Sequence, residues 1–247
     1  MLSNQTTSKL RSLRLHAMAE ALDLQGERPA MLDLSFEDRL AMLVDIECQS
    51  RDTRRINQLL KSSKLKIKAS PEDIDYRPDR GIDKRQLSSL FGCEWIERGQ
   101  NLIVTGPTGA GKTWLTYALG HQAIRRGHVV AYHRLPRLLE DIEIAREDGS
   151  LPKLRAQMIK SKLLILDDWG VAKISARCRQ DLLEVIDDRV GNLSLAITSQ
   201  MPVAEWHACI GDPTIADAIL DRIVHNAHRI DLKGESMRKR LAKPDIT

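Results

Sequence analysis

The chain has 247 residues, of which 42% are hydrophobic and 29% are charged, an ordinary balance for a folded globular protein. Lys and Arg number 38 against 34 Asp and Glu, so the net charge of +4 is too small to identify a nucleic-acid binder by itself. No apolar run reaches membrane-spanning length, and the N-terminus lacks the apolar core of a signal peptide. The four cysteines lie far apart, which favours reduced thiols. These features predict a cytoplasmic protein with no membrane partner.

Residues 1–69 are predicted to form a small, all-helical domain. Glycine is nearly absent there, and apolar residues recur at helical spacing. Ser35, followed three residues later by Asp38, is predicted to cap a long helix from Phe36 to about Lys61. The stretch from Ala69 to Gly99, with its prolines, glycines and alternating charges, indicates a linker that leads into a short helix near residues 84–90. We therefore expect two domains, residues 1–69 and 70–247.

Beyond residue 70, short apolar runs alternate with amphipathic segments. This alternation predicts an α/β fold in which helices flank a parallel sheet. The strand-like runs are Asn101 to Thr105, Val129 to Tyr132, Leu163 to Leu166 and Leu193 to Thr198.

A phosphate-binding motif lies directly after the first of these runs. Residues 106–113 read G-P-T-G-A-G-K-T, a full match to G-x-x-x-x-G-K-[ST] between a strand and a helix. Glycines let successive backbone N–H groups surround a phosphate, and the helix that follows adds the positive end of its dipole. Lys112 is expected to contact the β- and γ-phosphates and Thr113 to hold Mg²⁺. The predicted ATP-binding residues are Gly106, Pro107, Thr108, Gly109, Ala110, Gly111, Lys112 and Thr113.

Two further strand ends carry polar residues that complete a catalytic site. The run at residues 163–166 ends in Asp167 and Asp168, an acidic pair that in isolation is more often a turn but that follows a P-loop here. Asp167 is predicted to hold Mg²⁺, and Asp168 to orient and polarise the attacking water. Ser199 follows the next strand and is a candidate sensor of the γ-phosphate; the alternative is that it simply begins the turn before Pro202.

This combination resembles the AAA+ ATPases, within them the helicase-loader-like branch that includes DnaC and the IstB-like transposition helpers. The resemblance rests on D-D-W-G at residues 167–170, T-S-Q-M-P-V-A-E-W at 198–206, A-I-L-D-R-I-V-H-N-A-H-R-I at 218–230 and G-E-S-M-R at 234–238. It implies that the second domain is an AAA+ domain. The multi-helix lid that is common in AAA+ proteins is expected to be short or absent here. The resemblance further implies that Arg222 is the arginine finger of a neighbouring subunit, whereas Arg238 resembles a sensor arginine only loosely.

The resemblance also implies what the protein binds. IstB-like proteins assist a transposase encoded by the same mobile element and assemble on DNA as ATP-dependent oligomers. The expected partners are therefore double-stranded DNA, the cognate transposase and further copies of the chain, and the expected cofactors are ATP and Mg²⁺.

A dense basic segment is the candidate DNA contact. Between residues 48 and 70, seven basic residues stand against the single acid Asp52. Such a run is often only a solvated helix face, but beside this ATPase domain phosphate contact is the better interpretation. The predicted DNA-binding residues are Arg51, Arg54, Arg55, Lys61 and Lys64, with Arg134 and Arg137 as a second patch.

Three other functions compete with that of transposase helper. A replicative helicase loader of the DnaC type shares the fold and the chemistry and differs in its protein partner. A small-molecule P-loop kinase leaves the basic segment and Arg222 without a role. A scaffold that binds but does not hydrolyse nucleotide leaves Asp168 without one.

Overall fold

The computed structural model describes residues 2–28, 31, 33–234 and 236–237. The chain forms two compact units, residues 1–58 and residues 59–247, and the boundary between them falls inside helix α4 (Phe36–Ser63). The functional boundary expected near residue 70 stays a prediction. Among the described residues, no helix combines the length and the apolar character needed to cross a membrane.

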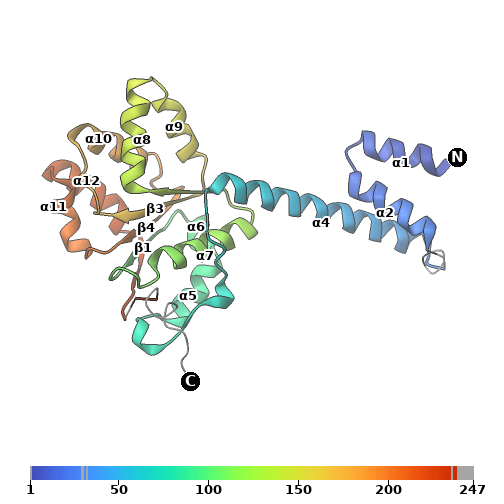
Figure 1. Cartoon of the computed structure of the whole chain (residues 1–247), viewed down its shortest axis with the longest axis horizontal. Coiled ribbons are helices and arrows are strands. Elements are labelled where there is room, and N and C mark those ends of the chain that lie inside the picture. The colour runs from blue at the N-terminus through green and yellow to red at the C-terminus, as the bar shows by residue number, and fades with distance from the viewer. Residues whose placement is uncertain (1, 29–30, 32, 235, 238–247) are drawn as a thin grey trace. The chain divides into compact units, whose positions relative to one another are not determined.

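The first unit consists of α1 (Leu2–Ser12), α2 (His16–Glu27) and α4 as far as Gln58 (Figure 1). The predicted cap of α4 is confirmed, because the Asp38 N–H donates to Ser35 Oγ at 3.1 Å. The buried Glu47 carboxylate accepts a hydrogen bond from the Met18 N–H at 3.0 Å, which ties α4 to the start of α2. The side of α4 that carries Glu47 thus packs against α2.

The second unit contains the sheet and its helices. Its elements after α4 are η1 (Pro71–Asp73), η2 (Pro78–Arg80), α5 (Lys84–Phe91), α6 (Glu94–Glu97), β1 (Asn101–Thr105), α7 (Lys112–Arg125), β2 (Val130–Arg134), α8 (Leu135–Glu147), α9 (Leu151–Ile159), β3 (Leu163–Trp169), α10 (Ala176–Asp187), β4 (Ser194–Ser199), η3 (Val203–Glu205), α11 (Trp206–Ile210), α12 (Pro213–Val224) and β5 (Ala227–Asp231).

The five strands form one parallel sheet in the order β2-β3-β4-β1-β5, which confirms the predicted fold class. Strand β4 lies between β1 and β3, so it separates the strand that precedes the phosphate-binding motif from the strand that carries the two aspartates. Pairing between β3 and β4 is regular up to Leu166 and shifts register before Trp169. The acidic pair lies within this irregular stretch, and β-bulges of this kind re-aim side chains.

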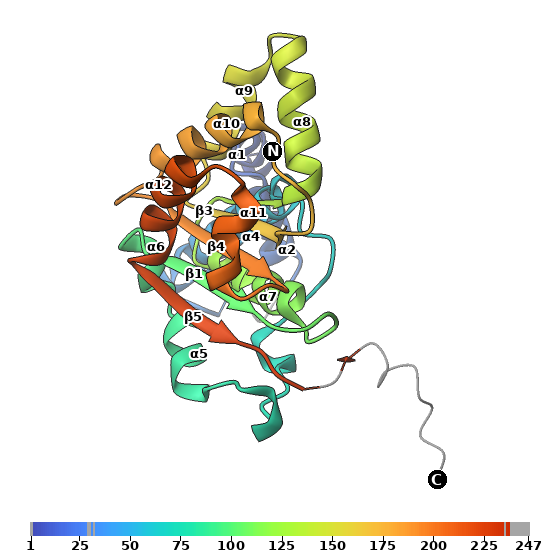
Figure 2. The same cartoon turned by 90° about the vertical axis from the view of Figure 1, so that its left-hand side faces the viewer.

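Helices cover both faces of the sheet (Figure 2). One face carries Leu164, Leu166 and Ile197, which pack in a single apolar core with residues of α8, α10 and α12. The other face is covered by α7, which contacts β2, β3 and β4. Residues that alternate along each strand serve the two faces in turn.

A short segment after α4 docks on α7. A side chain at Gly120 would lie 3.0 Å from Leu65 Cδ1 and 3.1 Å from Ile165 Cδ1, so the missing side chain leaves room for Leu65. The next residue of α7, His121, places its Nε2 atom 2.8 Å from the Ile67 carbonyl oxygen. The chain is therefore attached to α7 before it reaches α5.

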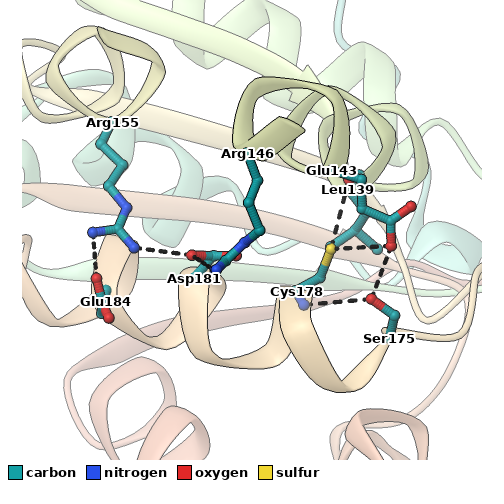
Figure 3. A network of polar contacts seen from close by, with 8 residues as sticks. All are labelled: Leu139, Glu143, Arg146, Arg155, Ser175, Cys178, Asp181 and Glu184. Atoms are coloured by element: carbon teal, nitrogen blue, oxygen red, sulfur yellow. Dashed lines mark hydrogen bonds and ion pairs between the residues drawn. The ribbon is translucent and has the colours of Figure 1, made fainter. Parts of the chain in front are cut away.

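An ion-pair network fastens α9 and the end of α8 to α10 (Figure 3). The buried Asp181 carboxylate on α10 accepts from Arg146 of α8 at 2.6 Å and from Arg155 of α9 at 3.0 Å. Arg155 also pairs with Glu184, one turn further along α10. Because a buried carboxylate is costly without partners, loss of both arginines would destabilise this corner of the domain.

Candidate functional site

The phosphate-binding motif forms the turn between β1 and α7. Gly106 has φ +142°, and a Cβ atom there would lie 2.3 Å from the Leu232 carbonyl oxygen. Gly111 has φ +94°, a conformation that side chains with a Cβ rarely adopt. The N–H groups of the first turn of α7 have no acceptors within the helix and are oriented for an anion. The backbone therefore fits the phosphates of a nucleotide.

Lys112, the first residue of α7, supplies the positive charge of this turn. Its Nζ atom donates to the carbonyl oxygens of Gly106 at 2.7 Å and Pro107 at 2.9 Å. Burial lowers the pKa of Lys112 from its ordinary value, and the nearby Asp168 and Asp167 carboxylates act in the opposite direction. A phosphate is a stronger acceptor than a carbonyl, so the ammonium group is placed to transfer its hydrogen bonds to a bound nucleotide.

The Asp167 carboxylate lies at the centre of the site, buried at the end of β3. It accepts from Thr113 Oγ1 at 3.0 Å, from Tyr132 Oη at 2.8 Å and from Thr198 Oγ1. Burial raises the pKa of the Tyr132 hydroxyl, so this group stays a donor. A hydroxyl and a carboxylate side by side are oxygen ligands of the kind that Mg²⁺ prefers. The pair Thr113 and Asp167 thus fits the predicted metal role.

Asp168 is held in a different environment. Its φ is +64°, and its N–H donates to Thr198 Oγ1 at 3.1 Å. Arg134, the last residue of β2, donates to Asp168 Oδ2 from Nε at 2.9 Å and from Nη2 at 2.7 Å. These hydrogen bonds raise the pKa of the Arg134 guanidinium. Asp168 is therefore next to the site but is engaged by a basic side chain.

The two polar residues at the end of β4 differ in what they touch. Ser199 is buried, and its hydroxyl donates to the Trp169 carbonyl at 2.8 Å and accepts from the Met201 N–H at 3.0 Å. Gln200 instead reaches the phosphate-binding turn, where its Oε1 accepts from Thr108 Oγ1 at 2.8 Å. Of the two, Gln200 is thus the residue whose side chain contacts the phosphate-binding turn.

Three residues of the site escaped the sequence analysis: Tyr132, Gln200 as a contact of the P-loop, and Arg80. Arg80 is buried, and its Nη2 atom donates to the Ala110 carbonyl at 2.6 Å, which supports the turn from outside. A signal for Tyr132 was available, because it lies in the strand beside β3 and close to its carboxyl end. Arg80 ends the short helix η2, ahead of the first strand, and had no such signal.

Arg222 lies at the other end of the sheet from its own P-loop. Its Nε atom pairs with Asp187 Oδ1 at 2.6 Å. Its carbonyl oxygen accepts from Asn101 Nδ2 at 3.1 Å, at the start of β1, whereas the P-loop follows the end of that strand. Four residue steps of a strand span about 13 Å. Within one chain, the backbone of Arg222 is thus remote from the phosphates.

The predicted DNA-binding residues are all exposed. Arg51, Arg54 and Arg55 lie on α4 in the first unit, where Arg51 pairs with Glu47 at 2.9 Å. Lys61 and Lys64 belong to the second unit, as do Arg137 on α8 and the Asp168 partner Arg134. Arg238 lies outside the described residues.

The strand order, the phosphate-binding turn and the acidic pair together define a P-loop nucleotide-binding protein of the AAA+ class. A family model described as IstB-like ATP binding protein matches residues 8–244, and the chain belongs to this family. A Sinorhizobium fredii protein named for an insertion sequence and ATP binding is 45% identical over 97% of this chain and 98% of its own length. A counterpart from the Pseudomonas fluorescens insertion sequence IS1162 is 48% identical over 82% of this chain and 88% of its own.

Solved structures resemble the ATPase fold. DnaI superposes with a TM-score of 0.58 at 22% identity, over 67% of this chain and 92% of its own. The DnaC helicase loader superposes with a TM-score of 0.53 at 21% identity, over 64% of this chain and 94% of its own. At these identities the likeness concerns the fold alone.

Proposed function

We propose that this protein is an ATPase that assembles on duplex DNA and stimulates the transposase of its own insertion sequence. The observation that carries the proposal is the cluster of Thr113, Asp167 and Asp168 beside the phosphate-binding turn, in a chain whose close relatives are named for insertion sequences. The cluster provides the groups that hydrolysis requires, and the relatives supply the biological setting.

The chain's own residues would act in hydrolysis as follows. The backbone of the turn and Lys112 bind the phosphates, while Thr113 and Asp167 hold Mg²⁺, which supplies positive charge against the phosphate oxygens. Asp168 orients a water molecule and accepts its proton as the water oxygen bonds to the γ-phosphorus and the bond to the ADP oxygen breaks. Asp168 must first leave Arg134, since a carboxylate held by a guanidinium is a weak base.

Assembly would complete the site. Arg222 is remote from its own P-loop, so we assign it to the γ-phosphate of a neighbouring subunit. Such a contact exists only while ATP is intact, and hydrolysis would therefore convert a stable assembly into a labile one. The transposase would recognise the ATP-bound assembly on its target.

DNA contact is assigned to the exposed basic residues, and its salt dependence tests it. Each phosphate contact contributes about 0.9 to the slope of log affinity against log salt concentration. Replacing Arg54 and Lys61 together by Gln should therefore flatten the slope by roughly 2. The exposed Arg98, which pairs with Glu94, serves as the matched control, and Arg98→Gln should leave the slope unchanged. An unchanged slope in the double variant would reassign these side chains to a solvated face.

Reconstitution tests the whole proposal. Purified transposase, donor ends and target DNA are combined with this protein, with and without ATP, and strand transfer is measured. We expect strand transfer to rise only when protein and ATP are both present. Strand transfer that is indifferent to both would refute the helper function. Recruitment of a replicative helicase in the same assay would favour the loader alternative.

A further inference from the structure

Strand β3 contains one residue more than its neighbour β4 at the acidic pair. The two strands are in register up to Leu166 and again at Trp169. Between these positions, Asp167 and Asp168 of β3 lie opposite the single residue Thr198 of β4. Two residues against one define a β-bulge. Asp168 accordingly has a φ of +64°, in the left-handed region that side chains with a Cβ rarely adopt.

The bulge decides where the Asp168 side chain points. Along a regular strand, side chains alternate between the two faces of the sheet. Asp168 would therefore follow Leu164 and Leu166 onto the face that carries the apolar core. Trp169 takes that place instead and is fully buried in the core. The extra residue thus keeps the Asp168 carboxylate out of the core, at the edge where it meets Arg134.

Two buried hydroxyl groups of β4 hold the bulge in this conformation. Thr198 Oγ1 accepts from the Asp168 N–H at 3.1 Å and donates to the Asp167 carboxylate. Ser199 Oγ donates to the Trp169 carbonyl oxygen at 2.8 Å. A bulge interrupts the main-chain ladder, and buried main-chain groups need partners. Side chains of β4 supply partners to main-chain groups of β3 on both sides of the bulge.

We propose that Thr198 and Ser199 are positioning residues, which fix the bulge and thereby aim the Asp168 carboxylate at the attacking water. The inference rests on the proposed function, in which Asp168 is the base. It gives Ser199 a role other than the γ-phosphate sensor that the sequence predicts. Its hydroxyl already donates to Trp169 and accepts from the Met201 N–H, so both of its hydrogen bonds serve the strand ends.

Substitution of Thr198 tests the first anchor. Thr198→Val keeps the shape of the side chain but deprives the Asp168 N–H of its acceptor, so kcat for ATP hydrolysis in the presence of duplex DNA should fall about tenfold. Affinity for ATP without Mg²⁺ should stay within about twofold of the wild type, because Lys112 and the phosphate-binding turn are unchanged. That affinity also shows that the variant folds. Thr198→Ser restores the hydroxyl and should recover most of the turnover.

A matched control lies on the same strand. Ser194 is also fully buried, but it begins β4, at the end of the sheet opposite the site. Its hydroxyl donates to the Trp95 carbonyl oxygen at 3.4 Å. Ser194→Ala should therefore leave kcat unchanged. A loss of turnover equal to that of Thr198→Val would show that any lost hydroxyl of β4 has this effect and would overturn the positioning role.

Ser199→Ala separates positioning from sensing. If Ser199 only holds the bulge, kcat should fall several-fold while the affinities for ATP and ADP both stay at their wild-type values. A contact with the γ-phosphate would instead exist only with ATP, so its loss would weaken ATP binding and spare ADP binding. Equilibrium binding of the two nucleotides measures the difference. Selective loss of ATP affinity would overturn the positioning role of Ser199.

A double variant tests whether Ser199 acts through Asp168. A residue that only aims the base has no further effect once the base is removed. Single-turnover phosphate release should therefore be equally slow in Asp168→Asn and in Asp168→Asn combined with Ser199→Ala. A further loss in the double variant would contradict the inference.

The same assays distinguish failure of this inference from failure of the proposed function. Wild-type turnover in both Thr198→Val and Ser199→Ala would overturn the positioning role and leave the proposed function standing. A wild type that releases no phosphate would refute the proposed function, and this role with it.

Discussion

Single residues divide the work of the nucleotide site between binding and turnover. Lys112→Ala removes a charge that is aimed at the phosphates, so ATP affinity should fall about 100-fold, equivalent to about 3 kcal/mol. Asp168→Asn leaves the phosphate contacts intact but removes the base, so ATP should still bind while turnover falls about 100-fold or more. Equilibrium binding of a fluorescent ATP analogue and phosphate release measure the two effects separately. Normal ATP affinity in Lys112→Ala, or normal turnover in Asp168→Asn, would contradict these assignments.

The ion pair between Arg134 and Asp168 makes a second prediction at this scale. Arg134→Ala frees the Asp168 carboxylate, so phosphate release without DNA should rise a few-fold. Arg137→Ala is the control, because Arg137 is exposed on the adjacent helix α8 and belongs to the same predicted patch. Equal basal rates in the wild type and Arg134→Ala would show that the pair does not restrain hydrolysis.

What the sequence could predict at this scale has a clear limit. Lys112, Thr113 and Asp167 follow from motif spacing, because backbone geometry dictates their positions relative to phosphate and metal. Ser199 was the predicted sensor of the γ-phosphate, although Gln200 stands next to it at the end of the same strand. The choice depends on which hydroxyl or amide finds a partner within the folded chain. Ser199 is occupied by Trp169, whereas Gln200 contacts Thr108.

At the scale of elements, strand β2 carries a half-buried histidine, His133, that makes stability depend on pH. Burial lowers the pKa of His133 from 6.5 to about 4, with Lys64 contributing in the same direction and Asp141 opposing it. As the pH falls from 6.5 towards 4, the unfolded chain binds a proton that the folded chain does not. The folded state therefore loses up to about 3 kcal/mol in this window.

Thermal denaturation measures this loss. The decrease in Tm between pH 7 and pH 5 should be smaller for His133→Gln than for the wild type. His225→Gln is the control, because the His225 side chain is 83% exposed. Parallel Tm profiles for the wild type and His133→Gln would show that His133 does not cause the acid sensitivity.

The sequence predicted the central strands of the sheet better than the edge strand β5. The strands β1, β3 and β4 are apolar runs buried in the sheet, and periodicity identifies such runs readily. Strand β5 was missed because it is an edge strand in which only Ile230 is buried, and its sequence A-H-R-I-D has no apolar run. Its strand conformation depends on pairing with β1, a tertiary contact that local sequence does not encode.

At the scale of the whole molecule, the position of Arg222 predicts that hydrolysis requires assembly. Arg222→Ala and Lys112→Ala should each be inactive alone, since one lacks the finger and the other the phosphate contact. Mixed assemblies contain interfaces that combine an intact Arg222 with an intact P-loop, so a mixture should recover part of the wild-type phosphate release. Verified mixed oligomers that stay inactive would exclude a finger supplied by the neighbouring subunit.

The docking of Leu65 beside Gly120 bears on how much chain length the connection to the ATPase sheet can tolerate. A flexible linker would accept insertions. Here, however, Leu65 packs against Gly120 of α7, and His121 holds the carbonyl of Ile67 two residues later. One added or deleted residue between 60 and 65 would move Leu65 out of this notch. The notch lies about 12 Å of helix from Lys112. A force applied to residues 60–65 would therefore be transmitted through α7 to the phosphate-binding turn, because this segment has no spare length to extend first.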